Sequence, residues 1–180
     1  MGNELSALIG VVLGAVLSYL VGMLNERTRW RREHAARWDG LLLQAYSDYG
    51  RAIKECVVAH QRLAAHQGLT EDPTPVEPTN DALEQAAHAE AKRAAMTEPL
   101  RLLADPTTAV AVRSVNDAVR HLEWMARGRP TGDASSWDQA YRAYRAARQT
   151  FYETARASLQ VPGGVMAERT TWPPSWRPRS

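Results

Sequence analysis

The sequence has little of what most chemical sites are built from. Among its 180 residues Cys56 is the only cysteine, so no disulfide can form within the chain and a four-cysteine zinc site is excluded. It contains no glycine-rich phosphate loop, no G-x-S-x-G and no H-E-x-x-H. The net charge is only +2, which weighs against a nucleic-acid partner. These features predict a non-enzymatic protein without a cofactor.

The few metal-ligating residue types do not form a recognisable motif. Glu84 with His88, and Asp117 with His121, are each four residues apart and could share a helix face. A ferritin-like di-iron site would need E-x-x-H spacing on two helices, which is absent. Ordinary surface pairs are the favoured interpretation. Cys56 lies on an apolar stripe, which favours a small buried core residue over a nucleophile.

What the chain does have is one long uncharged run, Leu5 to Leu24. A helix of its 20 residues spans about 30 Å, the thickness of a bilayer's hydrocarbon core. A secretion signal would need a basic start and a small-residue cleavage site, and neither is present. A soluble core helix is rarely apolar on all faces over this length. The run therefore predicts a permanent membrane anchor.

Basic residues follow this run, whereas only Glu4 precedes it as a charged side chain. The positive-inside rule then places the C-terminal side in the cytoplasm and the N-terminus outside. We expect a single-pass protein of the cell membrane, with the bilayer as one partner and a cluster of arginines at its surface. The predicted membrane-surface residues are Arg27, Arg29, Arg31, Arg32 and Arg37.

Small residues recur every four positions within the run and form a stripe on one face of the expected helix. Gly10 and Gly14 match the G-x-x-x-G pattern, which lets two membrane helices approach closely. Common glycine usage in membrane helices explains the pattern equally well, so self-association through this face stays one of two interpretations. The stripe consists of Ser6, Gly10, Gly14, Ser18 and Gly22.

The remaining chain shows helical periodicity and no competing strand pattern. Before Gln67, apolar residues alternate three and four apart, close to a coiled-coil heptad, which predicts a helix that leaves the membrane and reaches about His66. Three further helices are expected after it. The predicted core stripes are Trp38, Leu42, Ala45, Tyr49, Ile53, Cys56, His60 and Leu63; Leu83, Ala87, Ala91 and Ala94; Val112, Val115, Val119, Leu122 and Ala126; and Trp137, Tyr141, Tyr144, Phe151, Ala155 and Leu159.

Start signals precede each of these later helices. Asp81 with Glu84 three positions on, and Ser135 with Asp138, have the spacing of a capping box. Asp105 followed by a proline is typical of an N-cap. Near the end of the second helix, Pro99 is expected to kink or interrupt it.

Short connections favour antiparallel neighbours, so we expect an all-α fold in which an N-terminal transmembrane helix continues into an antiparallel cytosolic bundle of about four helices. The expected organisation is an anchor at 1–25, a basic juxtamembrane helix at 26–37 and the bundle at 38–160, with a Pro-rich loop at 68–80. A tail rich in proline, arginine and tryptophan, 161–180, is expected to be disordered.

With "LIGVVLGAVLSYLVGML" followed by "RTRWRREHAARW" and by helices rich in alanine and arginine, the chain resembles a loose group of uncharacterised bacterial single-pass membrane proteins. They are commonest in actinobacteria. The resemblance implies an N-terminal anchor helix with a cytoplasmic helical domain, and it brings no activity with it.

Together these features favour a membrane-tethered, non-enzymatic interaction or scaffold module that engages itself or another protein on the cytoplasmic face. One alternative is a metal-binding or enzymatic helical bundle with an unrecognised site. Another is binding of anionic lipid or nucleic acid through the segments rich in arginine and tryptophan.

Overall fold

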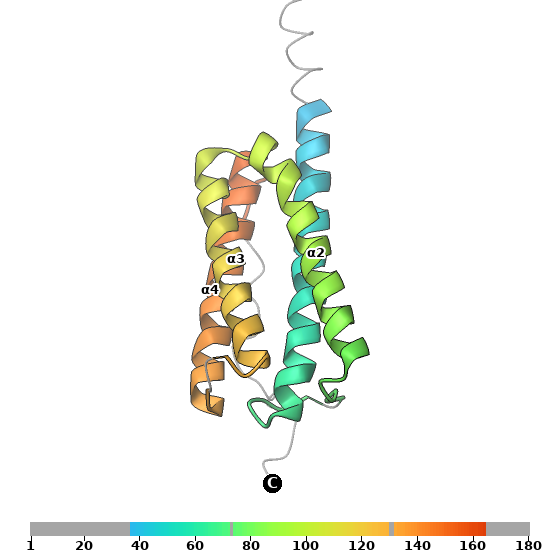
Figure 1. The fold of residues 1–180 in the computed structure, drawn as a ribbon. Coiled ribbons are helices and arrows are strands. Elements are labelled where there is room, and N and C mark those ends of the chain that lie inside the picture. Colours follow the sequence, from blue (N-terminus) through green and yellow to red (C-terminus); the bar gives the residue numbers. More distant parts are fainter. Residues whose placement is uncertain (1–36, 73, 130–131, 165–180) are drawn as a thin grey trace, which may run out of the picture. The chain divides into compact units, whose positions relative to one another are not determined.

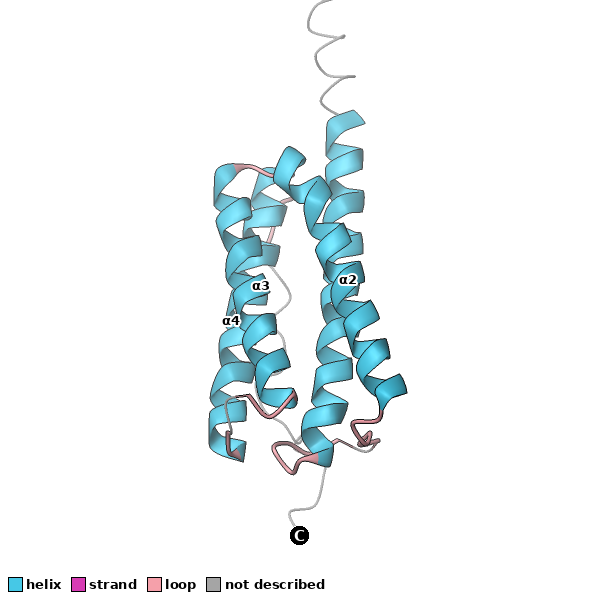
Figure 2. Ribbon diagram, viewed as in Figure 1, coloured by secondary structure: helices cyan, strands magenta, loops and turns pink. Residues whose placement is uncertain are grey.

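The computed structural model of this protein describes residues 37–72, 74–129 and 132–164. These residues contain four helices and no strand, which confirms the all-α expectation (Figure 2). The anchor, the small-residue stripe and four of the five predicted surface arginines lie outside the described ranges. Arg37 lies inside them, is helical and is exposed. Across the described part of the chain, no helix has the length and apolarity needed to span a membrane.

The chain divides into two compact units, Met1–Leu41 and Leu42–Ser180, and the helical bundle belongs to the second. Residues 37–66 are helical, and the portion from 42 to 66 is here called the leading helix. It is followed by α2 (Asn80–Leu103), α3 (Pro106–Ala126) and α4 (Ala134–Ser158). Successive helices run in opposite directions, so the bundle has the predicted antiparallel order (Figure 1).

The bundle consists of two helix pairs. The leading helix lies beside α2, and an ion pair between Glu55 and Lys92 joins them on the outside. The second pair is α3 with α4. Phe151 of α4 meets the rings of Tyr46 and Tyr49 edge-on, at centroid distances of 5.7 and 5.2 Å, and so connects the two pairs. Edge-to-face contacts of this kind add to the stability gained from burying the rings.

Three of the four helices have the core stripes that their periodicity predicts. On the leading helix, the residues from Ala45 to Leu63 in the predicted stripe are buried and Leu42 is partly buried, whereas Trp38 in the first unit is 54% exposed. All five predicted positions of α3 are buried. On α4 four are buried, and Tyr141 and Leu159 pack partly buried against them.

The prediction for α2 is wrong. Ala87, Ala91 and Ala94 are exposed, and only Leu83 of the predicted stripe packs against the core. The helix is rotated relative to the predicted stripe, and its buried face includes a charged residue, Arg93. That side chain can lie inside the bundle because it pairs with Glu90 on the same helix and bonds to Asn116 of α3. The buried members of this face are Ala86, Arg93, Thr97 and Leu100.

Two of the three predicted helix starts also differ. At α2 the N-cap is Thr79, whose hydroxyl accepts from the amide of Ala82, and Asp81 lies in the first turn. At α4 the capping box is formed by Asp133 and Ser136 rather than by Ser135 and Asp138. In both cases several Ser, Thr and Asp residues precede the helix, and each of them has an oxygen able to cap. Asp105 caps α3 as predicted.

The connections are short or held down by hydrogen bonds. The described residues of the Pro-rich loop turn back onto the leading helix, where the Val76 amide donates to the Arg62 carbonyl and the Arg62 side chain donates to the Thr74 carbonyl. Pro99 does not end α2, which continues to Leu103 and changes direction near its C-terminal end (Figure 1). Loss of the proline's N–H accounts for that bend.

Candidate functional site

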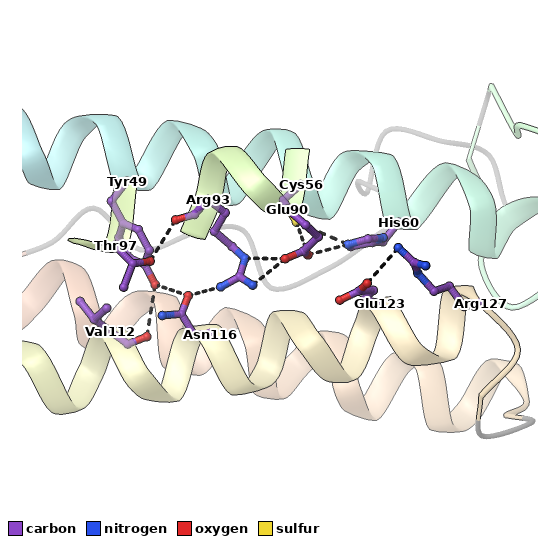
Figure 3. Close-up of polar contacts among 10 residues, drawn as sticks. All are labelled: Tyr49, Cys56, His60, Glu90, Arg93, Thr97, Val112, Asn116, Glu123 and Arg127. Carbon is purple, nitrogen blue, oxygen red and sulfur yellow. Dashed lines mark hydrogen bonds and ion pairs between the residues drawn. The ribbon is translucent and has the colours of Figure 1, made fainter. Parts of the chain in front are cut away.

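A polar cluster lies inside the bundle, and the carboxylate of Glu90 on α2 is its centre (Figure 3). One carboxylate oxygen, Oε1, accepts from the thiol of Cys56 at 2.6 Å and lies 2.9 Å from Nε2 of His60. The other oxygen, Oε2, accepts from Nε and Nη2 of Arg93, at 3.0 and 2.5 Å. Cys56 and His60 are fully buried, and the Glu90 side chain is 14% exposed.

The cluster extends from Arg93 to α3 and back to the leading helix. The third guanidinium nitrogen of Arg93, Nη1, donates to the side-chain oxygen of Asn116 on α3. The hydroxyl of Tyr49 lies 3.0 Å from the same oxygen and 3.2 Å from the carbonyl of Val112. Three of the four helices are therefore joined through one continuous set of polar contacts (Figure 3).

Helical spacing explains why these residues meet. Cys56 and His60 are four apart on the leading helix, so both side chains point from one face. Glu90 and Arg93 are three apart on α2 and likewise share a face. Because the leading helix and α2 lie side by side, the first pair faces the second. A sulfur, an imidazole nitrogen and a carboxylate oxygen therefore meet between these two helices.

The charges of the cluster follow from its contacts. Burial alone would raise the pKa of Glu90, but hydrogen bonds from His60, Cys56 and Arg93 outweigh it and lower that pKa to about 2. Burial, reinforced by the Glu90 carboxylate, raises the pKa of the Cys56 thiol. Burial opposes the charge of Arg93, yet its bonds to Glu90 raise its pKa. At neutral pH the cluster therefore holds a carboxylate, a guanidinium and a protonated thiol.

Two other polar groups of the cluster, the Tyr49 hydroxyl and the second ring nitrogen of His60, are also buried. The Tyr49 hydroxyl has a raised pKa, chiefly because of burial, and stays neutral. On His60, Nδ1 is buried and has no hydrogen-bond partner among the residues described. An unsatisfied buried nitrogen is costly, by about 1 to 3 kcal/mol, and marks His60 as a residue whose position is not explained by core packing alone.

The surroundings of Cys56 argue against a role for its thiol as a nucleophile. A cysteine nucleophile needs a thiolate and access to substrate. Cys56 has a raised pKa and no exposed surface, so it meets neither requirement. Its sulfur, the Nε2 atom of His60 and a carboxylate oxygen of Glu90 nevertheless form a set of metal-ligating atoms that all lie within 4.8 Å of one another.

The two pairs that were weighed as metal ligands and interpreted as ordinary surface pairs lie elsewhere. Glu84 and His88 are exposed on α2, and Asp117 and His121 are exposed on α3. Cys56 is buried on its stripe as predicted, although it contacts a carboxylate there. Sequence reasoning missed Glu90 and Arg93 because nothing in their spacing separates an inward from an outward charged pair. The available signal was that an inward face at Ala86, Glu90, Arg93, Thr97 and Leu100 also has helical spacing.

Comparisons with protein-family models, with curated proteins and with solved structures found no match for this chain.

Proposed function

We propose that the chain is a membrane-tethered, non-enzymatic helical module whose bundle engages a protein partner, or a second copy, on the cytoplasmic face. The observation that carries the proposal is the uncharged run from Leu5 to Leu24, followed directly by an arginine-rich segment. A run of this length matches the bilayer core, and the charge asymmetry fixes a cytoplasmic C-terminal side.

The composition of the bundle core supports the proposal. Among the described residues, those of the core lie between Ala45 and Ala155, and the partly buried residues packed on them lie between Leu42 and Leu159. Within the described part of the chain, the four helices therefore pack their apolar faces on one another. A stretch of 20 apolar and small residues favours an apolar environment, and a bilayer provides one.

Fusions after Ser180 in bacterial cells test the topology. A green fluorescent protein fused there should fluoresce, and alkaline phosphatase fused there should be inactive, because the C-terminus is cytoplasmic. Both fusion proteins should stay in the membrane fraction after alkaline carbonate washing. Active phosphatase, or release of the protein by the wash, would contradict the proposal.

Paired variants separate anchoring from folding. Leu13→Arg together with Leu17→Arg places two charges mid-span, each costing about 3 kcal/mol on an insertion scale, and should move the protein to the soluble fraction. Leu13→Ile together with Leu17→Ile changes the same positions and should leave it in the membrane. Any protein that co-purifies with the wild type and the isoleucine variant, but not with the arginine variant, depends on the anchor.

A further inference from the structure

The cluster around Glu90 brings together three atom types that metals use. The sulfur of Cys56 lies 3.4 Å from Nε2 of His60, and a carboxylate oxygen of Glu90 lies 2.6 Å from the sulfur and 2.9 Å from the nitrogen. Around a tetrahedral zinc ion, ligand atoms at ordinary bond lengths are about 3.3 to 3.6 Å apart. The Cys56 and His60 atoms already have that spacing. The carboxylate reaches it by withdrawing less than about 1 Å.

We propose that Cys56, His60 and Glu90 form a binding site for a borderline-soft divalent cation of the Zn²⁺ class. A thiolate and an imidazole favour such an ion over Ca²⁺ or Mg²⁺, which prefer oxygen ligands alone. The three ligands come from only two helices, with Cys56 and His60 on adjacent turns. Three protein ligands leave one coordination position for water or another small ligand.

The charges of the cluster suit a dication. On binding, Cys56 gives up its proton and becomes a thiolate, so that it and the Glu90 carboxylate supply two negative charges. Arg93 contacts the other carboxylate oxygen, Oε2, and leaves Oε1 for the ion. A ligating carboxylate is normally held by such an outer hydrogen bond. Arg93 repels the cation, and its bond to Oε2 also fixes the direction of the ligating oxygen.

The ion replaces the two hydrogen bonds that Glu90 Oε1 makes without it, one with Cys56 and one with His60. The thiol proton of Cys56 is released to solvent, and its bond to Glu90 becomes a sulfur–metal bond. Without the ion, Nε2 of His60 donates a hydrogen bond to the Glu90 carboxylate. On binding, that nitrogen loses its proton to solvent and Nδ1 gains one, so the ring stays neutral and the lone pair of Nε2 takes the ion. No electron transfer and no external reactant are needed, and binding should release one proton from the thiol.

The full-length protein in detergent, without a histidine tag and stripped of metal by a chelator, provides the test. Titration with Co²⁺ as the probe should give intense visible bands of tetrahedral cobalt and a near-ultraviolet thiolate-to-cobalt band, saturating at one ion per chain. Cys56 is the only cysteine, so the thiolate band has a single source. Zn²⁺ should then displace the cobalt and abolish the bands.

Substitutions assign the ligands. Cys56→Ser should abolish the thiolate band, and His60→Gln and Glu90→Gln should each weaken cobalt binding at least tenfold. His88→Gln and Glu84→Gln on the exposed face of α2 serve as matched controls and should bind like the wild type. Circular dichroism melts show whether each variant is folded. A thiolate band that persists in folded Cys56→Ser, or unchanged cobalt binding in folded His60→Gln and Glu90→Gln, contradicts the proposal.

A measurement on the wild type keeps the test valid if the ligand variants unfold. X-ray absorption at the zinc edge of the Zn²⁺-loaded protein should show one sulfur neighbour among nitrogen and oxygen ligands. Absence of a sulfur neighbour, or failure of the folded wild type to take up one equivalent of Co²⁺ or Zn²⁺, would show that the cluster is only a satisfied polar core.

Discussion

Glu90 and Arg93 form an ion pair inside the bundle, where most of the buried residues among those described are apolar. Removing such charges from water costs several kcal/mol for each ion, and the structure offsets this with a guanidinium that contacts the carboxylate twice. Cys56 and His60 add hydrogen bonds to the other carboxylate oxygen. Because each partner is buried mainly against the other, the loss of one partner costs more than the loss of both.

Substitution of this ion pair by apolar residues of similar length tests that argument. Arg93→Met leaves the Glu90 carboxylate without its cation and should lower the free energy of unfolding by about 3 kcal/mol. The double variant Glu90→Met with Arg93→Met should be less destabilised than Arg93→Met alone. Urea unfolding in the presence of a chelator measures both. A loss in the double variant as large as that in Arg93→Met, or larger, would contradict the argument.

At the scale of single elements, Asp105 shows how one residue starts a helix. Its carboxylate accepts from the amides of Thr107 and Thr108 and from the Thr108 hydroxyl. Burial opposes the charge, but these bonds outweigh it and lower the pKa of Asp105 below its ordinary 3.8. Its contribution to stability is therefore complete above about pH 4 and is lost as pH falls through the lower, folded-state pKa.

Asp105→Ala should accordingly reduce the free energy of unfolding by about 1 kcal/mol at pH 7. The difference from the wild type should shrink below about pH 4, because the wild-type carboxyl then becomes protonated and caps less well. Asp117→Ala, at an exposed position within the same helix, is the control and should cause no such loss. Urea unfolding at pH 7 and at pH 3 provides the comparison. A difference independent of pH would rule out capping by the ionised form.

The proposed anchor helix gives a second prediction for a single element. Gly14→Ile interrupts the small-residue stripe with a bulky side chain that pushes the two backbones apart. The segment stays apolar, so membrane insertion should survive and self-association should fall. Leu13→Ile, about a quarter-turn away, controls for side-chain change in general. A two-hybrid assay for membrane helices measures both. If Gly14→Ile and Leu13→Ile both match the wild type, the stripe does not mediate association.

Element by element, the fold could be predicted wherever bulky apolar residues mark the inward face. Val115, Val119 and Leu122 on α3 and Trp137 and Phe151 on α4 are examples. On α2 the alanines gave no contrast between faces, so hydrophobic periodicity could not fix the rotation of the helix. The candidate site could not be predicted for the same reason. Glu90 and Arg93 lie inside the bundle because other helices supply polar partners there, and the pattern within one helix does not reveal those partners.

On the scale of the whole molecule, the bundle should fold without the N-terminal segment, because every core residue in the described part of the chain comes from the second unit. A fragment of residues 38–164 should show a strongly helical circular dichroism spectrum and a cooperative thermal melt. The corresponding fragment extended to Ser180 should melt within about a degree of it. A melt several degrees higher for the longer fragment would mean that the tail stabilises the bundle.

The composition of the buried face of α2 has a consequence for the order in which the bundle opens. This helix buries only Ala86, Arg93, Thr97 and Leu100, whereas α3 buries eight residues, among them three valines and a leucine. Apolar burial contributes roughly 25 cal/mol per Å², so α2 has the smaller hydrophobic attachment and relies more on polar contacts. In native-state hydrogen exchange, the amides of α2 should therefore exchange with deuterium as one group before those of α3. That partial opening also gives solvent and ions a path to Glu90 without unfolding the other three helices.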